Sequence, residues 1–568
     1  MPITVTVLDT GGIQPFIFSS NVLRENIGAS ELVHRATRLW AFEELAALEP
    51  NHNIDVAAAE EDRVRAMYTG KFAVDGSAAI GVEVLYAGGG NTVALFQGKN
   101  HPERAKAFVY RLSRRILRDA PGLNLFAAHH PYTWESDETL PAVVDEAIKE
   151  LGKLKGRDPG SLPALGFPVT ADCTSTGLPA NDRHPDTKGK TGSAARANRQ
   201  VALKWETVDL ANDRLRGMFP WIEKALFEWT DNFDDLADLP RRDDNYVAVV
   251  HANGNGMGRR IKALTDQWKQ PENAANPRGY IETMRELSIR VQETAVNALK
   301  ATMMALTGHL VRDDWQDPVQ HARKNGKDYF PVRPLVFGGD DVTLVCAGPW
   351  GLAIARRYLA ELKHQTLTAG EEDPPYACAG VAIVKTHYPF SQAYDLSEKL
   401  LKGAKTRVRA LVGQDKQASA LDWHFTTTGL AAELREIRKR EYATSTGPLT
   451  MRPLMLDTDR SWRSWDNLVL LMEQFDDWHG QRNKLFRLRE ALRGGPAAVA
   501  EFWTIYGDPD LRLPVIDLDP RFSLDHGWAM PEPGHAEAQS RPVQPRCVYF
   551  DPIEIADQFF VLTPGEGE

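Results

Sequence analysis

Hydrophobic and polar residues alternate in short stretches along the first 130 residues, with longer stretches of helical periodicity between them. Residues 3–8 alternate in polarity and are rich in β-branched side chains, which is typical of a strand. Two later strand patterns are joined by Gly88-Gly-Gly-Asn91, where the glycines permit the positive φ angles of a tight hairpin turn. The pattern predicts the order strand, helix, strand, strand, helix, strand, at residues 3–8, 30–48, 79–87, 92–97, 102–117 and 123–128.

The same order of patterns returns in the second half of the chain. Its first helical stretch is interrupted by a Pro- and Asn-rich segment at 271–277, and its two central strands flank Gly338-Gly-Asp-Asp341. This order predicts a four-stranded antiparallel sheet with helices on one face, the ferredoxin-like or palm arrangement. The expected elements are residues 246–250, 258–306, 333–337, 342–346, 349–362 and 376–384, followed by a helix at 390–410.

The predicted fold class is α+β, with two ferredoxin-like βαββαβ palm domains, an intervening insert and a helical C-terminal region. With 568 residues the chain is too long for one hydrophobic core. We expect the palm domains at residues 1–130 and 241–430. Residues 131–240 are expected to form a linker or insert with a polar, turn-rich loop at 179–195. Residues 431–568 are expected to be mainly helical and to end in a Pro-rich, irregular tail.

Composition and charge narrow the functional classes. Hydrophobic residues make up 43% and charged residues 25%, which is ordinary for a folded protein. The net charge of −10 argues against a broad grip on duplex DNA. The four cysteines stand far apart with no Cys-x-x-Cys pair, so no cysteine-rich zinc site or disulfide framework is expected. No stretch of 18 apolar residues occurs, so we expect a cytoplasmic protein that does not enter a membrane.

The Gly338-Gly-Asp-Asp341 turn is the segment most suggestive of chemistry. Its glycines would let the backbone approach a bulky ligand such as a nucleotide. Two adjacent carboxylates repel each other, and a divalent cation with oxygen ligands relieves that repulsion. A similar tetrapeptide is often a plain hairpin turn, but its place in the middle hairpin of a palm favours a site. The first strand should lie beside it and supply further ligands from residues 251–258 (His-Ala-Asn-Gly-Asn-Gly-Met-Gly).

Together, residues 251–258 and 337–342 resemble the second palm of the large polymerase-like subunit of type III CRISPR effector complexes. The resemblance covers roughly residues 5–460, and its strength lies in several motifs that occur in the family's order. The other matching stretches are residues 12–18, 23–30, 86–91, 173–180, 381–390, 400–405 and 419–424.

The resemblance implies an enzyme that joins ATP into cyclic oligoadenylate for antiviral defence, with Mg²⁺ or Mn²⁺ as cofactor. It also implies other CRISPR effector subunits, guide RNA and target RNA as partners. Carried over by position, the expected metal ligands are Asp340, Asp341 and Asn253, with Asp340 and Asp341 as the catalytic residues. The expected nucleotide-binding residues are Gly338, Gly339, Gly254, Asn255 and Lys405.

Three departures from the family pattern change the expectations. Asn253 stands where the family usually has Asp, and an uncharged amide should weaken metal binding and lower the rate. The insert keeps only Cys173, so no zinc is expected there. The chain starts directly with the first palm, without the HD nuclease domain that the family often carries, so no such DNase activity is expected.

Two other interpretations remain open. Asn253 is also compatible with a catalytically weakened scaffold subunit of an RNA-guided effector complex. A relative of diguanylate cyclases ranks third, because Val342 follows the Asp pair where those proteins have an acidic residue and Phe. His251, at the end of a strand and without a neighbouring Cys or second His in the sequence, is interpreted as structural rather than as a metal ligand.

Overall fold

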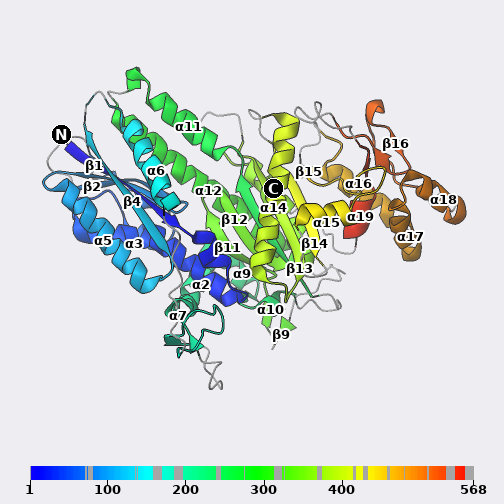
Figure 1. The fold of residues 1–568 in the computed structure, drawn as a ribbon, viewed down its shortest axis with the longest axis horizontal. Helices are drawn as coiled ribbons and strands as arrows, with labels where there is room; N and C mark the ends of the chain where they lie inside the picture. The colour runs from blue at the N-terminus through cyan, green and yellow to red at the C-terminus, as the bar shows by residue number, and fades with distance from the viewer. Residues whose placement is uncertain are drawn as a thin grey trace.

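The computed structural model describes residues 2–556 with gaps and shows two sheets side by side, followed by a helical C-terminal region (Figure 1). The undescribed residues are 1, 71–72, 75–80, 135, 137, 158–168, 185–195, 238–244, 274–275, 312–322, 325–326, 368–373, 414–417, 427–432, 457–460, 479, 508–510, 533–543 and 557–568. Most of the loop expected at 179–195 therefore lies outside the described residues.

The first sheet has four antiparallel strands in the order β2-β3-β1-β4. β1 (Pro2–Gly11) lies between β3 (Asn91–Gln97) and β4 (Asn124–Thr133), and β2 (Val82–Gly88) forms one edge. The predicted strand order and hairpin are observed. β4 continues five residues past the predicted end at residue 128, because Ala128 to Thr133 keep pairing with β1.

The second sheet has six strands in the order β11-β12-β8-β13-β14-β15, and its first four repeat the order of the first sheet. β8 lies between β12 and β13, and all three neighbouring pairs among β11, β12, β8 and β13 are antiparallel. β14 then pairs parallel to β13, which the sequence pattern did not predict. The bounds are β8 (Tyr246–Gly254), β11 (Val332–Gly338), β12 (Asp341–Ala347), β13 (Ala377–Lys385), β14 (Ala420–Thr426) and β15 (Leu454–Met455).

The helices predicted within each repeat share one face of its sheet, as expected, and a further helix covers the other face. On the first sheet, α3 (Trp40–Leu48) and α5 (His101–Asp119) pack on one face, while α6 (Leu140–Arg157) packs on the other. The physical reason for the further helix lies in β1, where Ile3, Val5 and Val7 form a second apolar face that must be buried. On the second sheet, α12 (Pro277–Leu310) and α13 (Gly351–Lys363) pack on one face and α14 (Phe390–Val412) packs on the other.

α12 (Pro277–Leu310) is a helix of 34 residues that joins the two sheets. Near its start, Tyr280 and Ile281 are buried against the first sheet, and near its end Met303 and Leu306 are buried in the core of the second. Asn276 caps the helix by accepting a hydrogen bond from the backbone N–H of Gly279. α11 (Met257–Trp268) precedes it, so the predicted break near residues 271–277 is present.

The remaining helices and short strands connect these units. The helices are α1 (Ile13–Phe18), α2 (Leu23–His34), α3 (Trp40–Leu48), α4 (Val56–Glu60), α7 (Arg199–Glu206), α8 (Val208–Met218), α9 (Pro220–Lys224) and α10 (Phe233–Ala237). A π-helical turn, Arg35–Leu39, joins α2 and α3 into one longer helical stretch. The short strands are β5 (Asp182–Arg183), β6 (Arg196–Ala197), β7 (Phe227–Glu228), β9 (Arg323–Lys324) and β10 (Lys327–Tyr329).

The C-terminal region is mainly helical, as predicted, but its tail is ordered where it is described. The helices are α15 (Leu434–Glu441), α16 (Trp465–Asp476), α17 (Arg482–Leu492) and α18 (Pro496–Tyr506). The tail then forms a small sheet and α19 (Phe550–Ile555), with strands β16 (Leu524–Asp525), β17 (Trp528–Ala529) and β18 (Arg546–Cys547). The expectation of an irregular tail is wrong, because Trp528, Cys547 and Ile555 are buried in the main core.

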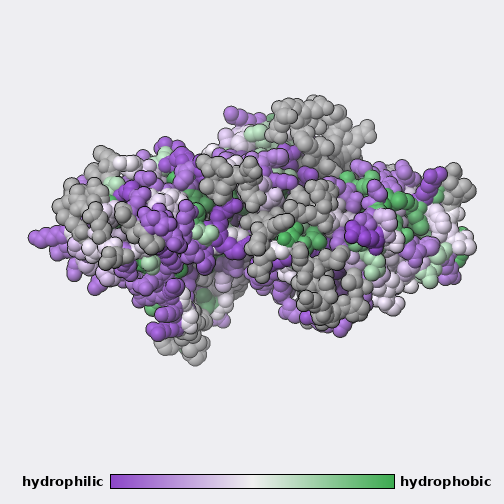
Figure 2. All heavy atoms as spheres, turned by 90° about the horizontal axis from the view of Figure 1, so that it is seen from above, coloured by the Kyte–Doolittle hydropathy of each residue, from purple (hydrophilic) through white to green (hydrophobic). Residues whose placement is uncertain are grey.

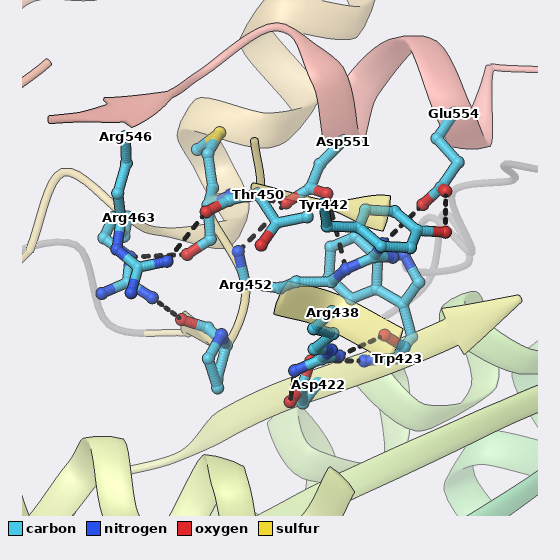
Figure 3. Close-up of polar contacts among 12 residues, drawn as sticks. Asp422, Trp423, Arg438, Tyr442, Thr450, Arg452, Arg463, Arg546, Asp551 and Glu554 are labelled. Carbon is cyan, nitrogen blue, oxygen red and sulfur yellow. Dashed lines mark hydrogen bonds and ion pairs between the residues drawn. The ribbon is translucent and has the colours of Figure 1, made fainter. Parts of the chain in front are cut away.

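A buried ionic cluster fastens this tail to the second sheet (Figure 3). Arg452 is fully buried and lies 2.7 Å from Glu554 and 3.5 Å from Asp551, both on α19. Its guanidinium also stacks on the rings of Trp423, from β14, and Tyr442. The tail therefore belongs to the same folded unit as the sheet.

On the face shown in Figure 2, the end that carries the first sheet is mostly hydrophilic, and hydrophobic side chains are more frequent towards the C-terminal region. Leu470, Phe486, Ile505 and Val515 of that region are exposed. Among the described residues, no helix combines the length and the apolar character needed to span a bilayer.

Candidate functional site

The Gly338-Gly-Asp-Asp341 turn joins β11 to β12 beside the end of β8. Gly338 and Gly339 have φ angles of 147° and 69°, which L side chains rarely adopt. Asp341 pairs with Asn253 across the two strands, so their side chains share one face of the sheet. The backbone N–H of Gly254 donates to the carbonyl of Asp340 at 2.8 Å, which fixes the turn against the end of β8.

The carboxylate of Asp341 is oriented by His251. His251 Nε2 lies 2.7 Å from Asp341 Oδ1, and the His251 side chain is only 3% exposed. The imidazole ring stacks on Tyr394 of α14, with 5.2 Å between ring centroids. His251 therefore contacts a predicted catalytic carboxylate, a contact that its position alone in the sequence did not reveal.

Lys405 lies on α14, which packs on one face of the second sheet, and its side chain extends to the end of β8. Its ammonium donates to Asn253 Oδ1 and, at 3.0 Å, to the backbone carbonyl of Gly254. Burial lowers the pKa of Lys405, while the nearby Cys378 and Asp340 act in the opposite direction. The lysine is thus held at the expected metal-binding end of the strand.

Asp340 is the carboxyl group of the turn whose pKa is shifted by its surroundings. Its pKa is raised by burial and by the adjacent carboxylate of Asp341, and Lys405 only partly offsets this. Two half-buried acidic groups therefore lie together with one ammonium group beside them.

Asp340 and Lys405 border a cavity of about 550 Å³, whereas Asp341 and His251 are not among the described residues on its wall. The structure brings five of the predicted residues to its wall, namely Asn253, Gly254, Asn255, Asp340 and Lys405. The Asn255 side chain also has an internal role, because its amide nitrogen donates to the carbonyl of Ala418 at 2.8 Å and to Cys378 Sγ at 3.2 Å. Gly338 and Gly339 face away from this wall towards α12 and the first sheet.

The cavity wall includes two arginines that the sequence reasoning missed. Arg259 lies in the first turn of α11, and Arg409 lies one turn after Lys405 on α14. Arg409 could have been found from its i, i+4 spacing from Lys405, which places both on the same face of a helix. With Lys405 they make this wall basic, which suits a polyphosphate.

The donor set around the turn fits a hard divalent cation. The carboxylates of Asp340 and Asp341, the amide oxygen of Asn253 and the carbonyl of Gly254 all supply oxygen, the ligand that Mg²⁺ and Mn²⁺ favour. Burial and the neighbouring Asp341 carboxylate raise the pKa of Asp340, and a bound cation would favour its ionised form. Within the described part of the chain, no three His, Cys, Asp or Glu side chains come together as a metal cluster.

The hairpin turns of the two sheets meet. A methyl group on Gly339 would lie 3.9 Å from the Cα of Gly89, which is ordinary van der Waals contact. Gln292 of α12 lies behind both turns, within about 4 Å of the positions that Cβ atoms would take on Gly88 and Gly338. Gln292 also accepts a hydrogen bond from Arg38 at 2.5 Å.

The first sheet holds a counterpart of this site with its charges exchanged. Asp9 of β1 pairs with Asn91 of the first hairpin, in the register that pairs Asn253 with Asp341 in the second sheet. Lys155, on the helix after β4, forms an ion pair with Asp9, as Lys405 contacts Asn253. The sequence reasoning missed Asp9 and Lys155, although aligning the two predicted repeats could have shown them.

The fold is thus of the mixed α+β class, with two sheets of like strand order joined by one long helix. No family model matches the chain, and no curated protein matches it. Among solved structures it is similar, at low identity and over nearly its whole length, to chains of Csm1–Csm4 assemblies, one of which is part of a type III-A CRISPR interference complex.

The first, a Csm1–Csm4 cassette in complex with AMPPNP, shares 13% identity with a TM-score of 0.49 over 98% of this chain and 69% of that one. The apo cassette shares 12% identity with a TM-score of 0.48 over 98% and 70%. The Csm1–Csm4 subcomplex of a type III-A interference complex shares 14% identity with a TM-score of 0.44 over 98% and 69%.

Proposed function

We propose that this protein is a metal-dependent nucleotidyltransferase of the type III CRISPR polymerase-like family, which makes cyclic oligoadenylate from ATP when target RNA is bound. One observation carries the proposal: Asp340, Asn253 and Lys405 border one cavity at a glycine turn, and that turn meets the matching turn of a second sheet. The two sheets, with the shared strand order β2-β3-β1-β4 and β11-β12-β8-β13, are then the two palms.

The residues would divide the work as follows. Asp340, Asp341 and Asn253 would hold Mg²⁺ or Mn²⁺, which when bound would stabilise negative charge on the reacting phosphates. His251 orients the Asp341 carboxylate through the 2.7 Å contact. Lys405 and Arg409 would contact the triphosphate from the cavity wall. Gly338 and Gly339 allow the positive φ angles of the turn that carries Asp340 and Asp341.

The proposed partners and domain limits follow from the motifs. The resemblance of residues 251–258 and 337–342 to the family supports assembly with other effector subunits, guide RNA and target RNA. The Csm4 of the similar solved structures is one such subunit in those complexes. We propose palms at residues 1–130 and 241–430 with an insert at 131–240, except that the end of β4 and α6 belong with the first palm, because they pair with its sheet and cover it.

The proposal is tested with labelled ATP and Mg²⁺ or Mn²⁺, using the protein alone and with its effector partners and target RNA. We expect oligoadenylate, and we expect D340N together with D341N to lower its rate on the order of 100-fold or more, since metal ligands are lost. D395N is the matched control, because Asp395 is an exposed carboxylate on α14 outside the cavity. No oligoadenylate from folded protein under any of these conditions would contradict the proposal.

A scaffold subunit with weakened catalysis is the second candidate. It is favoured by Asn253, which brings no charge to the metal site, and by the contact of Lys405 with that residue. A scaffold would bind its effector partners and show no synthesis above that of the D340N/D341N protein.

A further inference from the structure

The ammonium of Lys405 occupies two of the oxygens that a metal ion would need. It donates to Asn253 Oδ1 and to the carbonyl of Gly254, which lies 3.0 Å away. Asn253 is the strand-end ligand opposite Asp341, and Gly254 is fastened to Asp340 through the backbone. An ammonium and a divalent cation repel each other and cannot share these two oxygens.

We propose that Lys405 closes the metal site of the nucleotide-free protein, and that a triphosphate opens it by drawing the ammonium to itself. This inference rests on the proposed function, and it adds that metal and nucleotide bind as a coupled pair. Asn253 is essential to it, since its uncharged oxygen accepts the ammonium without adding a carboxylate to attract the metal.

The cavity beside Lys405 offers the ammonium a second place to bind, away from Asn253 and Gly254. Lys405 borders the cavity together with Arg409, so a triphosphate seated there would present several anionic oxygens to the ammonium. The lysine side chain is a flexible four-carbon stem and can turn from one set of oxygens to the other. Once it turns, Asn253 Oδ1 and the Gly254 carbonyl become available next to Asp340.

Coupling of this kind is reciprocal. If nucleotide raises the affinity for metal by a given factor, metal raises the affinity for nucleotide by the same factor, typically about 5- to 150-fold. The first sheet provides an internal comparison. There Lys155 contacts the Asp9 carboxylate, outside the cavity, so its removal should leave the metal affinity of the second site unchanged.

The experiment measures Mn²⁺ binding to the full chain by electron paramagnetic resonance and calorimetry, with and without AMPPNP, a non-hydrolysable ATP analogue. For the natural protein we expect weak Mn²⁺ binding alone and on the order of tenfold tighter binding with AMPPNP. K405M should bind Mn²⁺ alone on the order of tenfold more tightly than the natural protein, and AMPPNP should no longer enhance it. K405R, which keeps the cation, should retain weak binding alone, and K155M should behave as the natural protein.

The outcomes separate the two proposals. AMPPNP and Mn²⁺ that both bind, but independently of each other, would overturn the closure by Lys405 and leave the proposed function standing. Folded K405M that binds Mn²⁺ no better than the natural protein would also overturn it. If neither AMPPNP nor Mn²⁺ binds the natural protein, the proposed function fails and the coupling fails with it. Circular dichroism of each variant confirms folding, and K405Q, which also removes the cation, takes the place of K405M if K405M is unstable.

Discussion

At the scale of single residues, the site depends on the side chain at the end of β8, and its counterpart in the first sheet depends on the side chain at the end of β1. Asn253 in the second sheet faces Asp341, whereas Asp9 in the first sheet faces Asn91. Each pair therefore contains one carboxylate and one amide. The carboxylate of Asp340, at the turn, is what distinguishes the second site from the first, where Gly90 has the corresponding place.

A carboxylate at residue 253 tests whether the uncharged Asn253 weakens metal binding in the second sheet. We expect N253D to bind Mn²⁺ at least about tenfold more tightly, because a charged ligand replaces a neutral one. Oligoadenylate synthesis should rise with it if the site is an enzyme weakened by Asn253. Mn²⁺ titration and labelled ATP measure the two effects, with Q392E as the control, since Gln392 is an exposed amide on α14 away from the cavity wall. An unchanged Mn²⁺ affinity in N253D would show that Asn253 is not a metal ligand.

The sequence predicted much of this site because its motifs are local. The glycine turn and the strand end at 251–258 each lie within a few residues, and the hairpin pattern brings them together. The contacts of Lys405 with Asn253 and of His251 with Asp341 could not be derived in this way. They depend on how α14 packs on the sheet, and no short-range pattern encodes that packing.

At the scale of elements, the tail shows where sequence reasoning failed. The strand order of both sheets follows from alternation of polarity, but β16 to β18 have two residues each and leave no such pattern. The position of the tail is set by long-range contacts. Among them is the buried ionic cluster, in which Arg452 forms ion pairs with Asp551 and Glu554 of α19, the helix that follows β18 (Figure 3). His424 of β14 lies beside this cluster, with its ring against Tyr442.

His424 makes this junction sensitive to acid. Burial, with Arg452 and Arg438 nearby, lowers the pKa of His424 to about 3. An unfolded chain binds the proton near pH 6.5, so His424 favours unfolding as the pH falls from 6.5 towards 3. At pH 5 this amounts to about 2 kcal/mol of lost stability relative to neutral pH.

We therefore expect H424Q to lose less stability than the natural protein between pH 7.5 and pH 5. Chemical denaturation at the two pH values measures the difference. H387Q is the control, because the His387 side chain is 86% exposed and its removal should leave the pH dependence as it was. Equal losses in H424Q and in the natural protein would show that the pKa of His424 does not differ between the folded and unfolded states.

At the scale of the whole molecule, the two sheets are held in one arrangement by α12 and by the meeting of their hairpin turns. Gln292 is the residue common to both contacts, since it lies behind Gly88 and Gly338 and is bonded to Arg38. It is only 5% exposed. A side chain so placed should affect the site and the stability together.

We expect Q292A to lower the free energy of unfolding by about 1–3 kcal/mol, because the buried Arg38 loses a hydrogen-bond acceptor. Oligoadenylate synthesis and AMPPNP binding should fall as well, since the turn that carries Asp340 loses its support. Thermal unfolding and AMPPNP titration measure the two effects. E282A, at an exposed position of the same helix, should change neither. A Q292A protein as stable and as competent in binding as the natural one would contradict this role.

Because α12 is one continuous helix, the two sheets cannot separate from each other on dilution. A helix of 34 residues is about 50 Å long, and it is buried in the cores of both sheets. The hairpin turn of the first sheet and the hairpin turn of the second sheet therefore always come from the same molecule. The covalent chain fixes the effective concentration of one turn at the other. A site assembled from two separate copies of the chain would fall apart at low protein concentration, whereas here the two turns stay together at any dilution, even where partner subunits and target RNA dissociate.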